Sequence, residues 1–153
     1  GEYIVALDLA KYLSYVVSTQ PLKTAPAFDT LGVCGQKASG ENGEFGDCSG
    51  SDVNFTQYSA GKNGVALEAQ IKENVHLLNP MDFIGTEEAS VAAHWYIRHG
   101  ARDRDTSFMV SMCLALKLEQ ADKDVDFKLP WNRPHSGDYA LDEMFAWIAG
   151  ILK

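Results

Sequence analysis

"HWYIRHGARDRD", residues 94–105, begins with an aromatic and apolar run typical of a β-strand and ends in a charged loop. Working outward, residues 106–118 have a helical pattern, with Phe108, Met112, Ala115 and Leu116 on one stripe and Asp105 or Thr106 as the expected N-cap. Residues 125–129 alternate apolar and charged side chains, as in a half-buried strand near a sheet edge, and residues 141–152 form a strongly amphipathic helix. This order of strand, helix, strand and helix predicts an α/β fold.

Two strands with two helices cannot cover both faces of a parallel sheet by themselves. We therefore expect residues 86–153 to complete a larger sheet rather than to fold as a separate domain.

The N-terminal part of the sequence has a different character. Residues 3–19 have helix-like spacing that Pro21 ends, and a weaker helical pattern covers about 65–78. Between them, residues 29–64 are glycine-rich with little periodicity, which indicates a binding loop or part of an inserted lid. Cys34 and Cys48 bracket part of this loop and either pair as a disulfide or stay free, whereas Cys113 is expected in the core.

Composition excludes some classes of function. The 153 residues carry 21 acidic and 13 basic side chains, a formal net charge of −8, which disfavours nucleic acid and anionic membrane as partners. There is no apolar run of the length that spans a bilayer. The histidines and acids follow no metal-binding spacing, so we expect no metal.

The chemistry of the chain is expected where the two predicted strands end. Asp103 follows the first strand and His135 the second, 32 positions later, with one helix between them. An acid followed by a histidine is the order in which an α/β-hydrolase presents the last two members of its catalytic triad. His135 would move the proton, Asp103 would orient the imidazole, and His99 is expected to support the turn before Asp103. On residue type alone, each has the alternative of a surface, turn or capping role. The chain contains no G-x-S-x-G motif for the nucleophilic serine.

Longer segments show a specific resemblance. "HWYIRHGARDRDTS" and "KDVDFKLPWNRPHSGDYALDEMFAWI" closely resemble the end of the bacterial tannases, tannin acyl hydrolases of the α/β-hydrolase superfamily. The resemblance extends upstream to "LKTAPAFDT", "ENGEFGD" and "NPMDFIG", while residues 34–40 look like an insertion.

The resemblance implies a set of site residues. It makes Asp103 and His135 catalytic and Asp105 a contact to the ring hydroxyls of a galloyl group. Two further hydroxyl contacts from the lid domain map onto Lys23, with Lys37 as an alternative, and Glu41. Carboxylates that accept and a lysine that donates suit a trihydroxyphenyl ring. Neither a metal nor an organic cofactor is implied.

Together these observations predict the C-terminal part of an α/β-hydrolase sheet (residues 86–153) plus the end of an inserted lid domain (residues 1–85). The expected function is hydrolysis of galloyl esters through an acyl-enzyme. The expected partner is the N-terminal portion of the same enzyme, or a second chain, that carries the serine. Two alternatives stay open: a feruloyl-type aromatic esterase, and a non-catalytic fragment or phenolic-binding module.

Overall fold

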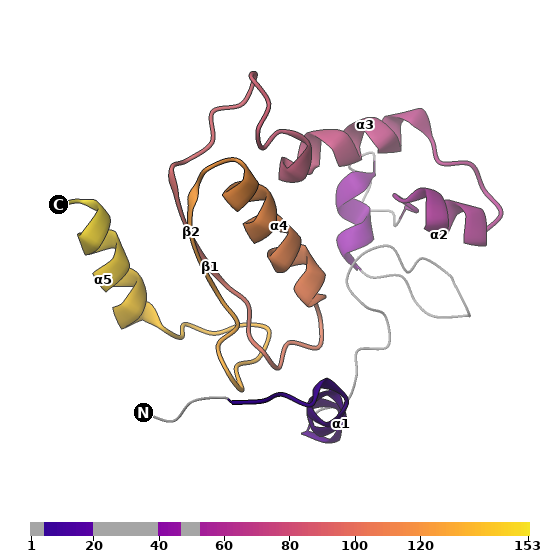
Figure 1. Cartoon of the computed structure of the whole chain (residues 1–153). Helices are drawn as coiled ribbons and strands as arrows, with labels where there is room; N and C mark the ends of the chain where they lie inside the picture. Colours follow the sequence, from indigo (N-terminus) through magenta and orange to yellow (C-terminus); the bar gives the residue numbers. More distant parts are fainter. Residues whose placement is uncertain (1–4, 20–39, 47–52) are drawn as a thin grey trace.

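The computed structural model describes residues 5–19, 40–46 and 53–153 (Figure 1). Within these ranges helices and strands alternate along the chain. The elements are α1 (Leu9–Thr19), the 3₁₀ helix η2 (Gly40–Phe45), α2 (Gln57–Lys62), α3 (Ala69–Leu78), the 3₁₀ turn η3 (Pro80–Asp82), β1 (His94–Arg98), α4 (Phe108–Gln120), β2 (Asp124–Lys128) and α5 (Leu141–Ile151). None of the described helices is long and apolar enough to cross a bilayer.

β1 and β2 form a two-stranded parallel sheet in the described part of the chain. His94 pairs with Asp124 at one end and Arg98 with Lys128 at the other. Parallel strands need a crossover connection, and α4 supplies it. The predicted order of strand, helix, strand and helix is thereby confirmed. The fold mixes helices and strands and contains a small parallel sheet.

α4 and α5 lie on opposite sides of the strand pair (Figure 1). Side chains alternate between the faces of a strand, so Tyr96 and Arg98 share one face. On that face the Tyr96 ring lies 5.5 Å from the Trp147 ring, and Arg98 forms an ion pair with Glu143 at 3.2 Å, both partners being on α5. The polar half of each strand therefore faces α5.

The start of α4 differs from the expectation. Ser107, rather than Asp105 or Thr106, is the N-cap, and its hydroxyl accepts the N–H of Met109 at 3.2 Å. The expected apolar stripe is also wrong in part, because Met112 and Leu116 are exposed. The buried residues of α4 are Ala115 and Leu118.

α1 packs beside the loops that follow the two strands. It begins at Leu9, not at residue 3 as predicted, because the Asp8 carboxylate accepts the N–H of Lys11. Tyr12 and Val16 are buried together with Ala101, and the Tyr12 ring lies 4.8 Å from the Trp131 ring. The N-terminal helix thus touches the segments after both β1 and β2.

The glycine-rich segment with little periodicity contains two short helices, η2 and α2, in its described part. Thr56 caps α2 by accepting the N–H of Ser59, and Asn54 accepts from the side chains of Ser59 and Asn63. Downstream, α3 begins at Ala69 rather than near residue 65, and its Asn74 donates to the carbonyl of Phe45 in η2. Cys34 and Cys48 lie outside the described residues, and Cys113 is a half-buried free thiol.

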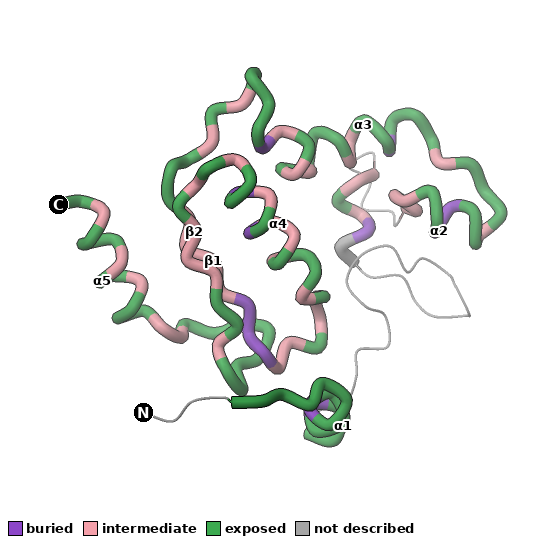
Figure 2. Tube along the Cα trace, viewed as in Figure 1, coloured by how far each residue is buried: buried purple, intermediate pink, exposed green. Residues whose placement is uncertain are grey.

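Burial is unevenly distributed over the described residues. Figure 2 shows buried positions where β1 runs into the following loop and in small patches on helices other than α5. α5 has no buried residue. Its apolar side chains Leu141, Phe145 and Ile148 are exposed, as is that of the C-cap residue Leu152.

Candidate active site

The loops after β1 and β2 are joined to each other by main-chain hydrogen bonds. His99 donates its backbone N–H to Lys128 O, Ala101 to Pro130 O, and Arg102 to Arg133 O. The parallel ladder therefore continues beyond the strands and brings the segment of Asp103 alongside the segment of His135.

Gly100 makes this close approach possible. A Cβ at this position would lie 2.2 Å from the carbonyl oxygen of Pro134 and 2.4 Å from that of Arg133. Both neighbours are backbone atoms, which cannot move aside without separating the loops. A side chain at residue 100 is thus incompatible with the observed contact.

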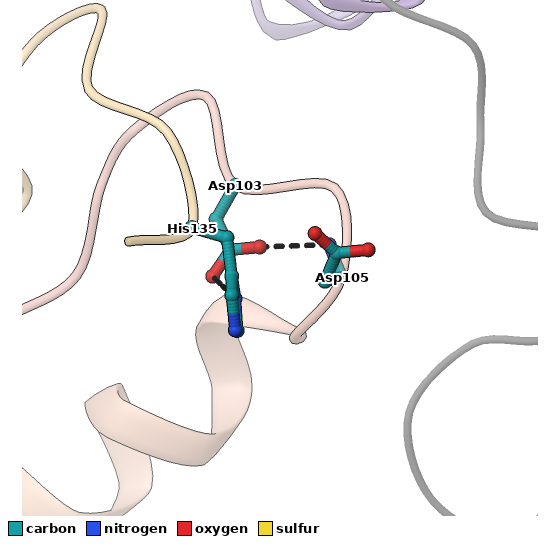
Figure 3. A group of neighbouring side chains, drawn as sticks. All are labelled: Asp103, Asp105 and His135. Atoms are coloured by element: carbon teal, nitrogen blue, oxygen red, sulfur yellow. Dashed lines mark hydrogen bonds and ion pairs between the residues drawn. The ribbon is translucent and has the colours of Figure 1, made fainter. Parts of the chain in front are cut away.

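Asp103 and His135 meet at this junction, as the sequence predicted. Oδ2 of Asp103 lies 3.0 Å from Nδ1 of His135 (Figure 3). Oδ1 of Asp103 accepts the N–H groups of Asp105 at 2.7 Å and of Thr106 at 3.1 Å. The carboxylate is therefore fixed from one side by the main chain and faces the imidazole on the other.

Burial distinguishes this pair from two other histidine–aspartate pairs in the described chain. His76 contacts Asp82 at 2.9 Å and His94 contacts Asp124 at 2.8 Å. Their acid side chains are 39% and 60% exposed, whereas Asp103 is 5% exposed. A buried carboxylate interacts more strongly with a facing imidazole because water screens it less. His135 itself is 51% exposed, so a reacting group can approach its ring.

The Asp103 carboxyl group is held in its ionised form. Burial raises the pKa of Asp103, but hydrogen bonds from Asp105, His135 and Thr106 outweigh it and bring this pKa below its usual range. The neighbouring residues Arg102 and Arg104 are not among the causes of the shift. The acid therefore stays negative at neutral pH.

This arrangement suits proton transfer. Because Nδ1 of His135 faces the carboxylate, Nε2 on the opposite side of the ring is left for a reacting group. An imidazole so oriented takes a proton at Nε2, and the adjacent negative charge stabilises the imidazolium that forms.

Asp103, Asp105 and His135 also form a group whose ligand atoms lie within 4.8 Å of one another, close enough for a metal ion. The lone pairs of Asp103 argue against this use. A carboxylate has about four acceptor positions. Two main-chain N–H groups and two imidazole nitrogens, of His99 and His135, already lie 2.7–3.1 Å from its oxygens. A cation would have to displace these donors, so acid–base chemistry fits the geometry better.

The structure brings Asp105 to the same place and leaves two predicted residues unassigned. The Asp105 side chain is 20% exposed and lies 3.8 Å from Nε of Arg104. Glu41 lies in η2, but the position of its side chain is outside the description, and Lys23 and Lys37 lie outside the described residues. Three of the five predicted site residues, Asp103, Asp105 and His135, are thus neighbours.

Sequence reasoning assigned His99 to the turn but missed its contact with the carboxylate. Nε2 of His99 lies 3.1 Å from Oδ2 of Asp103, and Nδ1 lies 2.8 Å from Oγ of Ser111. The signal available was the four-residue spacing of His99 and Asp103 across a turn, which Asp103 N–H closes by donating to Gly100 O.

The fold and the site together define a mixed helix–strand protein whose small parallel sheet carries a buried acid beside an exposed histidine. No family model and no curated protein matches the chain. Solved structures do. The native tannin acyl hydrolase of Lactobacillus plantarum is similar over 83% of this chain and 27% of its own, with 41% identity and a TM-score of 0.71.

Two other structures agree. Fusobacterium nucleatum tannase is similar over 83% of this chain and 27% of its own, with 36% identity and a TM-score of 0.64. A tannin acyl hydrolase in complex with ethyl gallate is similar over 74% of this chain and 24% of its own, with 41% identity and a TM-score of 0.65. The chain is similar to the bacterial tannases, as its motifs indicated, and it spans about a quarter of the length of these structures.

Proposed function

We propose that this chain supplies the acid and the histidine of a serine esterase that cleaves galloyl esters. His135 is the proton carrier and Asp103 is the acid that orients it. The nucleophilic serine comes from a polypeptide segment other than these 153 residues, because none of them lies in a G-x-S-x-G motif.

The observation that carries the proposal is the 3.0 Å contact between the buried Asp103 carboxylate and Nδ1 of the exposed His135. Because of this contact, Nε2 of His135 is free to accept a proton, and the negative charge of Asp103 lies at the other nitrogen of the ring. The similarity to tannin acyl hydrolases at 36–42% identity supports the same chemistry.

In the proposed reaction the serine oxygen attacks the ester carbonyl carbon and its proton passes to Nε2 of His135. The imidazolium then protonates the leaving alcohol, which leaves a galloyl group on the serine. Water, deprotonated in turn by His135, attacks the acyl carbon, and the imidazolium returns its proton to the serine oxygen as gallate leaves. Throughout, Asp103 stays ionised and stabilises the positive ring.

Recognition of the galloyl ring is assigned to Asp105, Glu41 and Lys23. A carboxylate oxygen of Asp105 lies within 4.8 Å of an imidazole nitrogen of His135, the proton carrier. A carboxylate there accepts hydrogen bonds from ring hydroxyls, and a ring without hydroxyls would leave it unpaired. The structure solved with ethyl gallate is a relative at 41% identity, which supports this class of ester.

The serine-bearing partner would extend the two-stranded sheet into an α/β-hydrolase sheet, with residues 86–153 as its last strand–helix units and residues 1–85 as the end of a lid. Three features support this division. The sheet has free strand edges in the described chain, α5 buries none of its residues, and α1 packs beside the site loops at Ala101. An inserted lid is expected to lie over such loops.

The proposal is tested by complementation. The chain is co-expressed with the N-terminal portion of a bacterial tannase, which carries the serine, and hydrolysis of ethyl gallate is measured for the pair and for each part. We expect hydrolysis of ethyl gallate only when both parts are present. Intact-mass analysis of the chain should give 16.8 kDa, so that a contaminating full-length esterase is recognised.

A matched variant keeps the result specific. His135→Gln should abolish turnover by the pair, whereas His94→Gln, which removes the histidine of an exposed pair, should leave it unchanged. Equal turnover of ethyl ferulate would favour a feruloyl-type esterase. Gallate binding by the chain alone without turnover in the pair would favour a phenolic-binding module.

A further inference from the structure

A second histidine lies against the acid of the proposed catalytic pair. Oδ2 of Asp103 is 3.1 Å from Nε2 of His99, nearly the same distance as from Nδ1 of His135. The side chains of His99 and Asp103 are 7% and 5% exposed, whereas His135 is 51% exposed. His99 therefore belongs to the protein interior and does not meet a substrate.

The surroundings of His99 fix its ring. The ring of Phe108 meets it edge-on at 5.1 Å, and Oγ of Ser111 lies 2.8 Å from its Nδ1. Both partners come from the first turn of α4, so the helix holds the imidazole in place. Nε2 is buried and lies at ion-pair distance from the carboxylate, without the alignment of a well-formed hydrogen bond.

These contacts restrict where the proton of His99 resides. A lone pair on Nε2 would face the negative charge of Asp103 at 3.1 Å, and this repulsion favours the tautomer with the hydrogen on Nε2. In a neutral ring Nδ1 is then an acceptor, for which the Ser111 hydroxyl is the donor when it turns from the Phe108 carbonyl oxygen, 3.2 Å from the same Oγ, to the imidazole at 2.8 Å.

We propose that His99 is a positioning residue for the catalytic acid: the Ser111 hydroxyl fixes its Nε2–H tautomer, and this N–H steers the Asp103 carboxylate toward His135. The effect of His99 on turnover rests on the proposed esterase function. The tautomer itself does not depend on that function. The side-chain contacts thus run outward from α4, from Ser111 to His99, then to Asp103 and then to His135.

The direct test is the tautomeric state of the histidines. The chain is labelled with ¹⁵N-histidine, and two-bond ¹⁵N–¹H correlation spectra are recorded for the wild type, Ser111→Ala, His99→Leu and His99→Gln. We expect Nε2–H for His99 and Nδ1–H for His135 in the wild type. Ser111→Ala should give a mixture for His99, and His99→Leu a mixture for His135. A wild-type His99 with its hydrogen on Nδ1 would overturn the proposal.

Turnover gives a second, independent readout. In the complemented pair, His99→Leu should lower kcat for ethyl gallate about 10- to 100-fold with KM unchanged, because the lost N–H acts on the acid and not on the substrate. His99→Gln, whose amide can place an N–H where Nε2 was, should recover part of kcat. A wild-type kcat in His99→Leu, with an unaltered His135 spectrum, would also overturn the proposal.

Two features keep the outcomes distinct. If the pair hydrolyses no gallate ester, the esterase proposal fails while the spectra still decide the role of His99. If His99→Leu does not fold, Ser111→Ala decides, because alanine is favourable in a helix and Ser111 lies within α4. An unchanged His99 tautomer in Ser111→Ala counts against the serine as the fixing group.

Discussion

Asp103 combines burial with four nitrogen atoms within 3.1 Å of its two oxygens, which makes its charge the fixed point of the site. In Asp103→Asn one oxygen becomes an NH₂ group, which cannot accept from His135 Nδ1–H and favours the wrong tautomer. By analogy with triad enzymes, we expect kcat for ethyl gallate to fall about 10⁴-fold in the complemented pair. Asp124→Asn, at an exposed pair, is the control and should change kcat little.

The lowered pKa of Asp103 also predicts a pH dependence of stability. The native state binds this proton less readily than the unfolded chain, whose carboxyl titrates near 3.8. The stabilisation is therefore complete above the unfolded value and is lost as the pH falls through the native one. We expect the difference in free energy of unfolding between wild type and Asp103→Asn to shrink as urea unfolding is repeated from pH 7 to pH 3. A difference that grows over this range would contradict the assignment.

Gly100 is expected to be the least replaceable residue of the two loops. In Gly100→Ala the new methyl group would collide with the carbonyl oxygens of Pro134 and Arg133. We predict a loss of about 1–3 kcal/mol in the free energy of unfolding, measured with urea, together with loss of turnover. Gly61→Ala is the control, because nothing lies within 4 Å of the added Cβ in α2, and it should be neutral or slightly stabilising.

At the scale of residues the sequence predicted Asp103 and His135 because each follows a strand, and adjacent parallel strands end at one edge. It did not predict that His99 reaches Asp103, because that contact depends on the turn in which Asp103 N–H donates to Gly100 O at 2.9 Å. Such a turn leaves no periodic pattern. The roles of Glu41 and Lys23 rest on motif resemblance alone.

At the scale of elements, β1, β2 and α5 were predictable from periodicity, whereas helix starts were not. Three consecutive polar residues, Asp105, Thr106 and Ser107, can each cap α4 by type. The N–H groups of the first two donate to Asp103, and the hydroxyl of the third, Ser107, accepts the N–H of Met109 and is the cap. Likewise α2 depends on polar contacts of Thr56 and Asn54, which hydrophobic spacing does not reveal.

This assignment of the cap leads to an element-scale prediction. Ser107→Ala removes the acceptor for the N–H of Met109 and should lower the free energy of unfolding by about 1 kcal/mol. Thr106→Ala keeps the backbone N–H that donates to Asp103 and should cost less than about 0.5 kcal/mol. Urea denaturation of both variants checks the difference, and equal losses would mean that Thr106 shares the cap.

At the scale of the whole molecule, the exposed apolar face of α5 and the free strand edges indicate a surface meant to be covered. If the serine-bearing portion of a tannase binds there, it stabilises the chain by mass action. At a concentration about 100 times its Kd, the expected gain is about 2.7 kcal/mol. This corresponds to a rise of roughly 5–10 °C in Tm for a chain of this size.

A matched pair of substitutions locates that surface. Phe145→Ser removes an apolar side chain that is 61% exposed on α5, and Tyr58→Ser removes one that is 72% exposed on α2. Neither should change the Tm of the chain alone by much, because little buried contact is lost. With the partner present, Phe145→Ser should lose most of the stabilisation and Tyr58→Ser should retain it. If both variants gain as much as the wild type, α5 is not the docking face and the sheet is extended elsewhere.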